Sequence, residues 1–221
     1  MKSKAIIFSR AWRISLVAAI LGAFIGLVAA QGADPAAMAG QYAAKARENA
    51  ALTRQFTWQM RVEITLKGET KPALLFQMRY DLDGKLQKTL LTAPSQKKPS
   101  NDAKEWAEKL VDLVQDYLAP SPGKMMDFYI GAAYAKSPDG RIQASGSAFI
   151  QPSDKVTFWV DAETKAPVRY EFQTVLDGDA VSGKVDFGQA PNGPQYAARL
   201  VIDVPAKKVS AKIENFKYER Q

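Results

Sequence analysis

The residues of this chain that could do chemistry are carboxylates, serines, lysines and tyrosines, because the sequence contains neither histidine nor cysteine. Without those two side chains there is no imidazole base, no thiolate nucleophile, no Ser/His/Asp triad, and no zinc or haem site with the usual ligands. Chemistry with carboxylates alone, with Ser and Lys, or with Tyr passes this filter. We therefore predict a protein that is not an enzyme and needs no cofactor.

Two acidic turns, at residues 81–84 and 177–179, superficially resemble ligand loops. A calcium loop that began at Asp81 would need an oxygen ligand at its fifth position and a glutamate at its twelfth, where the chain has Lys85 and Thr92. Aspartate and glycine are also common in tight turns. We interpret both segments as turns and predict no metal site.

Serines and further carboxylates lie on segments that look like strands. Ser145 and Ser147 lack the flanking glycines that the nucleophile turn of a hydrolase requires, so we interpret them as strand residues. Asp161, Glu163 and Glu171 could supply a glycosidase-like pair, but they fall at strand ends or on polar faces without a signature spacing. A carboxylate hydrolase is therefore the least favoured function.

The elements that must position any site are mostly strands. Residues 56–66 alternate apolar and polar side chains without a break, which predicts one long strand with one buried and one solvated face. The segments 74–82 and 86–90 continue this pattern on either side of a tight Asp-Gly turn. Six later strands are predicted over 141–150, 155–161, 168–176, 181–187, 196–204 and 207–218. The segments give about nine strands, almost all of them in meander order.

The last predicted strand changes its phase. Val209, Ala211 and Ile213 share one face, whereas Phe216 and Tyr218 have the opposite phase. An extra residue in a strand produces such a shift, so we predict a β-bulge near residues 214–215.

Helical spacing occurs in two regions. A capping aspartate and a proline precede an alanine-rich helix predicted over 35–52. Apolar residues recur every three or four positions from residue 101 or 102 until Pro120, and a shorter helix follows over 123–133. The second region is a helical insertion, residues 101–133, between two groups of strands.

The N-terminal segment has the pattern of a secretory leader. Four cations and no acidic residue precede an uncharged apolar run over 14–30, which ends in small residues. We predict a signal peptide over 1–30, cleaved after Ala30. The apolar run is long for a leader, so the alternative is an uncleaved membrane anchor.

Removal of residues 1–30 leaves a domain over 31–221, which is long enough for one sizeable core. Four of the cations behind the net charge of +7 lie in the leader, so the remainder carries only +3 and gives no case for nucleic acid. Without cysteine, stability outside the cytoplasm must come from the packed core rather than from disulfides.

The amount of apolar surface on the long strands is the most informative feature. Two interpretations stay open: an ordinary filled core, or a cavity between the sheet and its helices that admits an apolar ligand. Methionine suits surfaces that adapt to different apolar partners. The candidates for lining such a cavity are Trp58, Met60, Phe76, Met78, Met125, Met126 and Phe158.

Residues 155–169, KVTFWVDAETKAPVR, have the order strand, acidic turn, proline, strand. With the leader, the N-terminal helix, the long antiparallel strands and the helical insertion, this order resembles the Lol-type periplasmic lipoprotein carriers and related half-barrel lipid-binding domains. The resemblance implies an α+β fold with a large curved antiparallel sheet, an unclosed β-barrel. It also implies that the N-terminal helix and the helical insertion cover a concave face that takes acyl chains. No binding residue of that family aligns with a particular position here.

We predict a non-catalytic protein of the cell envelope that binds an acyl chain, a lipid or a lipid-modified protein. The alternative is an envelope protein-interaction or sensor module with a solid core and no lipid ligand. The expected location is the periplasm or the exterior. If residues 14–30 are uncleaved, they contact the membrane and anchor the chain in the inner membrane.

Overall fold

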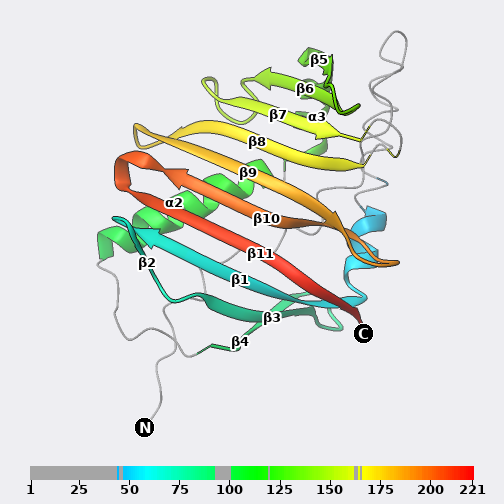
Figure 1. Cartoon of the computed structure of the whole chain (residues 1–221), viewed down its shortest axis with the longest axis vertical. Coiled ribbons are helices and arrows are strands. Elements are labelled where there is room, and N and C mark those ends of the chain that lie inside the picture. Colours follow the sequence, from blue (N-terminus) through cyan, green and yellow to red (C-terminus); the bar gives the residue numbers. More distant parts are fainter. Residues whose placement is uncertain (1–43, 45–46, 93–100, 119, 162–163, 165) are drawn as a thin grey trace.

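The computed structural model describes residues 44, 47–92, 101–118, 120–161, 164 and 166–221. These residues form one eleven-stranded antiparallel sheet, in the order β4-β3-β1-β11-β10-β9-β8-β7-β6-β5, with the short β2 paired to β1 (Figure 1). Strands β4 and β5 lie at opposite ends of this order and do not pair with each other within the described chain. The sheet is therefore an open half-barrel, which confirms the predicted fold class.

The elements of the first part of the chain are β1 (Phe56–Leu66), β2 (Glu69–Thr70), β3 (Leu74–Tyr80), β4 (Leu86–Leu90), α2 (Asn101–Leu118) and α3 (Pro122–Gly131). The strands of the second part are β5 (Ala133–Lys136), β6 (Ile142–Ser147), β7 (Lys155–Val160), β8 (Pro167–Leu176), β9 (Asp179–Gln189), β10 (Gln195–Val204) and β11 (Val209–Arg220). A short 3₁₀ helix, Pro205–Lys207, joins β10 to β11. A helical segment over 47–53 precedes β1.

Tight turns join most neighbouring strands. Asp177 and Gly178 both have positive φ angles, as do Lys67 and Gly68, which is the geometry of the turns that match the twist of a hairpin. The last strand, β11, then returns to pair with β1. The first and the last strands of the chain therefore lie side by side inside the sheet, two strands from its β4 edge.

One face of the sheet is apolar and carries the core. A single row of buried side chains crosses seven neighbouring strands in register. The members of this row, from β1 to β6, are Val62, Ile213, Leu200, Val185, Tyr170, Phe158 and Ala144. Helix α2 packs against β8 and α3 packs against β6, and Figure 1 shows α2 running behind the sheet. The helical insertion thus covers the apolar face, as the sequence indicated.

The β-bulge in the last strand exists, but its predicted position near 214–215 is wrong. The register between β1 and β11 shifts at Lys217, whose φ of 54° marks the extra residue. Asn215 faces the core opposite Met60, where its side chain donates to the Ala197 carbonyl oxygen at 2.8 Å. Because Asn215 is a polar residue on the core face, the sequence pattern places the bulge two residues before its true position at Lys217.

Strands β2 and β5 were not predicted, and the second predicted helix, 123–133, ends early because β5 begins at Ala133. All residues of both strands are exposed, so they carry no alternation of apolar and polar positions. Helix α3 begins as expected from a cap: the Ser121 side chain accepts a hydrogen bond from the Lys124 backbone N–H.

The predicted leader, and most of the predicted helix over 35–52, lie outside the described residues. From residue 47 onward the helix is present. In the part of the chain that the structure describes, no helix combines the length and apolarity needed to cross a membrane.

Candidate functional site

Four of the seven candidate residues lie together on the apolar face of β1 and β3. Trp58 is opposite Met78, and Met60 is opposite Phe76, so the four side chains form one contiguous group that we call the β1/β3 block. The alternation of the two strands places all four on the same face. Each is buried, with no more than 8% of its surface exposed.

The β1/β3 block continues onto the edge strand β4. There Lys88 lies opposite Met78, and Leu90 lies opposite Phe76. Leu90 is 38% exposed, so the apolar face meets solvent at this edge of the sheet. Lys88 is half-buried, and this burial lowers the pKa of its ammonium group.

On its other side, the β1/β3 block meets a row of stacked aromatic rings. The Trp58 ring stacks on Tyr218 of β11 with 5.4 Å between centroids, and Tyr218 stacks on Tyr196 of β10 at 4.0 Å. The bulge at Lys217 makes this row, because it returns Tyr218 to the core face. Burial raises the pKa of the Tyr218 phenol, so its hydroxyl stays protonated near neutral pH.

The other three candidates lie elsewhere. Phe158 is on β7, and four strands separate β7 from β1. Met125 is buried and Met126 partly buried on α3, which packs against β6 rather than β1. The seven residues therefore lie at two places on the apolar face, and six of them, all but Met126, belong to one continuous buried core.

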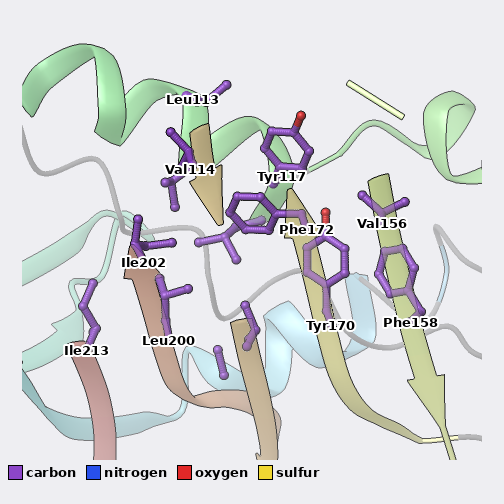
Figure 2. Close-up of a cluster of buried hydrophobic side chains, with 14 of the residues drawn as sticks. Leu113, Val114, Tyr117, Val156, Phe158, Tyr170, Phe172, Leu200, Ile202 and Ile213 are labelled. Atoms are coloured by element: carbon purple, nitrogen blue, oxygen red, sulfur yellow. The ribbon is translucent and has the colours of Figure 1, made fainter. Parts of the chain in front are cut away.

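The region around Phe158 is filled by aromatic rings from the sheet, the helices and the loop before β7. In Figure 2, Tyr117 of α2 lies over Phe172 of β8, and their rings stack at 4.3 Å. Phe158 stacks on Tyr170 at 4.2 Å. We call this group the aromatic cluster; its members are Tyr117, Phe128, Phe149, Phe158, Tyr170 and Phe172.

Glycines in the sheet make room for these rings. A Cβ atom on Gly183 would lie 2.1 Å from the Phe172 ring, and one on Gly146 would lie 2.8 Å from the Phe128 ring. The rings therefore rest directly on the backbone of β9 and β6. This close packing gives the half of the sheet under α2 and α3 a filled core.

A buried carboxylate fastens α2 to the loop between β6 and β7. Asp154 is fully buried, and it accepts hydrogen bonds from the backbone N–H groups of Phe149 and Ile150, each at 2.7 Å, and of Gln151 at 2.9 Å. The Tyr117 hydroxyl donates to the same carboxylate at 2.7 Å. Burial raises the pKa of that phenol, which keeps the donor protonated.

Sequence reasoning missed this arrangement, which was visible only as an aspartate after the Pro-Ser turn at 152–153. The carboxylate of Asp154 accepts its hydrogen bonds from groups within the protein. The oxygen of the Thr174 hydroxyl lies 2.8 Å from the Tyr117 hydroxyl oxygen. These contacts give Asp154 a structural role, since they hold the loop, the helix and β8 together.

The acidic turns hold their own backbone. The Asp81 carboxylate accepts from the backbone N–H groups of Asp83 at 3.0 Å and Lys85 at 2.8 Å, which lowers its pKa. The Asp161 carboxylate accepts from the backbone N–H of Thr164 at 2.7 Å. Over the described ranges, no group of three or more acidic side chains is placed to hold a metal ion.

No family model matches the chain, and no curated protein matches its sequence. Among solved structures, it is similar to a LolA superfamily protein from Nitrosomonas europaea, with 11% identity and a TM-score of 0.37 over 76% of this chain and 87% of that one. It is also similar to a DUF1329 family protein from Desulfovibrio piger, with 11% identity and a TM-score of 0.40 over 79% and 88%.

A third similar structure is described as an outer membrane lipoprotein-sorting protein domain from Vibrio parahaemolyticus, with 10% identity and a TM-score of 0.40 over 75% and 85% of the two chains. The resemblance to LolA-type proteins that the sequence indicated is thus also found among solved structures.

Proposed function

We propose that this chain is an exported, non-catalytic envelope protein that holds an acyl chain, a lipid or a lipid-modified protein against the β1/β3 block. The observation that carries the proposal is the block itself, four large apolar side chains in register beside an edge where the apolar residue Leu90 reaches solvent. Because the four side chains are buried, an acyl chain that entered at this edge would reach them by displacing the side chains that now cover them.

The composition of the block suits such a ligand. Met60 and Met78 have unbranched side chains that can change rotamer around a flexible hydrocarbon. Each CH₂ group of a chain that leaves water contributes about 0.8 kcal/mol of favourable free energy. Burial of ten or so such groups would contribute about 8 kcal/mol, which is comparable to the cost of association of about 4–15 kcal/mol.

Export is the second part of the proposal. It is supported by the basic and apolar order of residues 1–30, with cleavage after Ala30, and by a chain without cysteine that needs no disulfides. A soluble periplasmic carrier and an anchored lipid-binding protein would use the same sheet.

Leu90 and Thr89 offer a matched test of ligand binding. Leu90 is opposite Phe76 on the apolar face, whereas Thr89 is opposite Gln77 on the other face of the same edge strand, and both residues are exposed. We expect Leu90→Glu to weaken binding of a fluorescent fatty acid at least about tenfold, because the carboxylate repels the apolar chain. Thr89→Glu should bind as the unaltered protein does. Equal binding by both variants would remove the β1/β3 block as the site.

The second candidate function is a protein-interaction or sensor module with a solid core. The aromatic cluster favours it, since stacked rings fill the half of the sheet under α2 and α3. Under this alternative, the purified protein would bring down a stoichiometric protein partner and would not bind the fatty-acid probe.

A further inference from the structure

Strand β5 is an exposed edge of the sheet. Among the strands of the described chain it pairs only with β6, and all of its residues are exposed. Figure 1 shows β5 at the opposite end of the sheet from β4. An edge strand presents backbone N–H and C=O groups with which a further strand can pair.

The ladder between β5 and β6 shows which backbone groups of β5 point outward. In the turn that joins the two strands, the Ser137 backbone N–H donates to the Arg141 carbonyl oxygen at 2.8 Å, so these residues form a hydrogen-bonded pair. Bonded and non-bonded pairs alternate along an antiparallel ladder. Ala135 therefore directs its backbone groups toward β6, whereas Tyr134 and Lys136 direct theirs away from the sheet.

The side chains of this edge are apolar and cationic. Tyr134 and Lys136 lie on the core face of the sheet, because Tyr134 is opposite the buried Ala144. The Tyr134 hydroxyl donates to the Tyr129 carbonyl oxygen of α3 at 2.5 Å, and 39% of the residue stays exposed. Ile130, the next residue of α3, is 65% exposed. An aromatic ring, an aliphatic side chain and a cation therefore gather at this edge.

The sequence of β5 fits a second copy of itself in antiparallel orientation. When a two-fold axis passes Ala135, each Tyr134 lies opposite Lys136 of the second copy, and the outward backbone groups of both residues are paired. A lysine ammonium beside a tyrosine ring is a favourable cross-strand contact. Ala135 lies opposite itself, where its small side chain lets the strands approach. A register that placed Lys136 opposite itself would bring like charges together and is disfavoured.

We propose that β5 is a self-association edge: two copies of this chain pair their β5 strands about a two-fold axis at Ala135 and join their sheets into one. Such an interface uses the same surface on both copies, so it closes at a dimer. Because β5 has only four residues, the association is weak and depends on protein concentration. The two β4 edges lie at the far ends of the joined sheet, so this inference does not depend on the proposed function.

The test places charges at the two-fold axis. Sedimentation equilibrium of the exported protein, at concentrations up to about 1 mM, compares the unaltered protein, Ala135→Glu, Ala135→Lys and an equal mixture of these two variants. The matched control is Ala133→Glu. Ala133 is exposed on the same face of the same strand, but in the proposed register it lies opposite Ser137 rather than opposite itself.

We expect the unaltered protein and Ala133→Glu to dimerise. Ala135→Glu and Ala135→Lys should each dimerise at least about tenfold more weakly, because like charges meet at the axis. Their mixture should recover the dimer, because opposite charges then meet there. Hydrogen exchange of the unaltered protein provides a measurement without substitution: the amide protons of Tyr134 and Lys136 should exchange more slowly as the protein concentration rises.

Three results would overturn the inference. The first is an unaltered protein that stays monomeric over the whole concentration range. The second is a dimer that both single variants keep, or one in which the Tyr134 and Lys136 amides exchange equally fast at low and high concentration, since it would use a different surface. The third is a mixture, or an Ala133→Glu control, that stays monomeric, which would contradict the register centred on Ala135.

Discussion

Two buried tyrosines of the aromatic cluster differ in what their hydroxyl groups bind. The Tyr117 hydroxyl donates to the buried Asp154 carboxylate at 2.7 Å. The Tyr170 hydroxyl is also buried but has no hydrogen-bond partner among the described residues. A buried polar group stabilises a fold only when it is satisfied, so the same change at these two positions should have opposite effects.

We expect Tyr117→Phe to lower the free energy of unfolding by about 1–3 kcal/mol, because a buried carboxylate then loses a donor. Tyr170→Phe removes an unsatisfied hydroxyl and should leave stability unchanged or raise it by up to about 2 kcal/mol. Urea unfolding followed by tryptophan fluorescence measures both. A stable Tyr117→Phe together with an unstable Tyr170→Phe would contradict the claim that the Tyr117 hydroxyl, and not the Tyr170 hydroxyl, stabilises the fold through a hydrogen bond.

Alkaline pH should unfold the protein through its buried tyrosines. Burial raises the pKa of Tyr170 and Tyr218 above the ordinary value of 10.0. Above about pH 10 the unfolded chain releases these phenolic protons while the folded chain retains them, so this part of the stability is present below pH 10 and is lost as the pH rises. The free energy of unfolding should therefore fall between pH 8 and pH 11, and this fall should be smaller for Tyr218→Phe than for the unaltered protein. An identical fall in both would contradict this origin.

Several residue-scale features were accessible from the sequence and others were not. Strict alternation identified Trp58, Met60, Phe76 and Met78 as sharing a face, because a strand puts every second side chain on one side. The same alternation contains Lys88 between Leu86 and Leu90, but a charge inside an apolar pattern acquires meaning only when its neighbours are known. The contacts of Asp154 join residues far apart in the sequence, so no local pattern could reveal them.

At the scale of elements, the helices can approach the sheet closely because glycine occupies positions where a larger residue would clash. The Phe172 ring lies over Gly183 on the neighbouring strand β9, where a Cβ atom would be 2.1 Å from the ring. The ring of Tyr117, on α2, stacks on the ring of Phe172. The absence of a side chain at Gly183 therefore lets the Phe172 ring, and with it α2, lie close to the sheet.

Gly183→Ala should destabilise the protein by about 1–3 kcal/mol, because the added methyl forces the Phe172 ring and α2 away from β9. Gly131 at the end of α3 is a matched control, since a Cβ atom there would have no neighbour within 4 Å. Gly131→Ala should change stability by less than about 0.5 kcal/mol. Thermal unfolding of the two variants compares them, and equal melting temperatures would mean that the ring does not rest on the strand.

Most elements could be predicted because the chain alternates between two clear periods. The alternation of apolar and polar residues predicts both ends of β1. Helical spacing and the prolines that follow it predict the two helices of the insertion. The exposed strand β5 could not be recognised, since only its pairing with β6 defines it. The bulge was misplaced because Asn215 is a polar residue that faces the core and is satisfied by a carbonyl oxygen of β10.

At the scale of the whole molecule, the open sheet carries one continuous buried core. The aromatic cluster lies at one end of this core, around β6 to β9, and the β1/β3 block lies at the other end, near the open β4 edge. The open antiparallel fold could be predicted from the sequence. The places of these two groups on the apolar face could not, because they depend on which strands neighbour one another.

Native mass spectrometry of the protein exported by a bacterial host and purified without added lipid tests the central claim most directly. We predict a mature chain that begins at Gln31 and carries a mixture of bound acyl-chain masses, which Leu90→Glu reduces and Thr89→Glu retains. A ligand-free chain that also fails to take up a fluorescent fatty acid would contradict it.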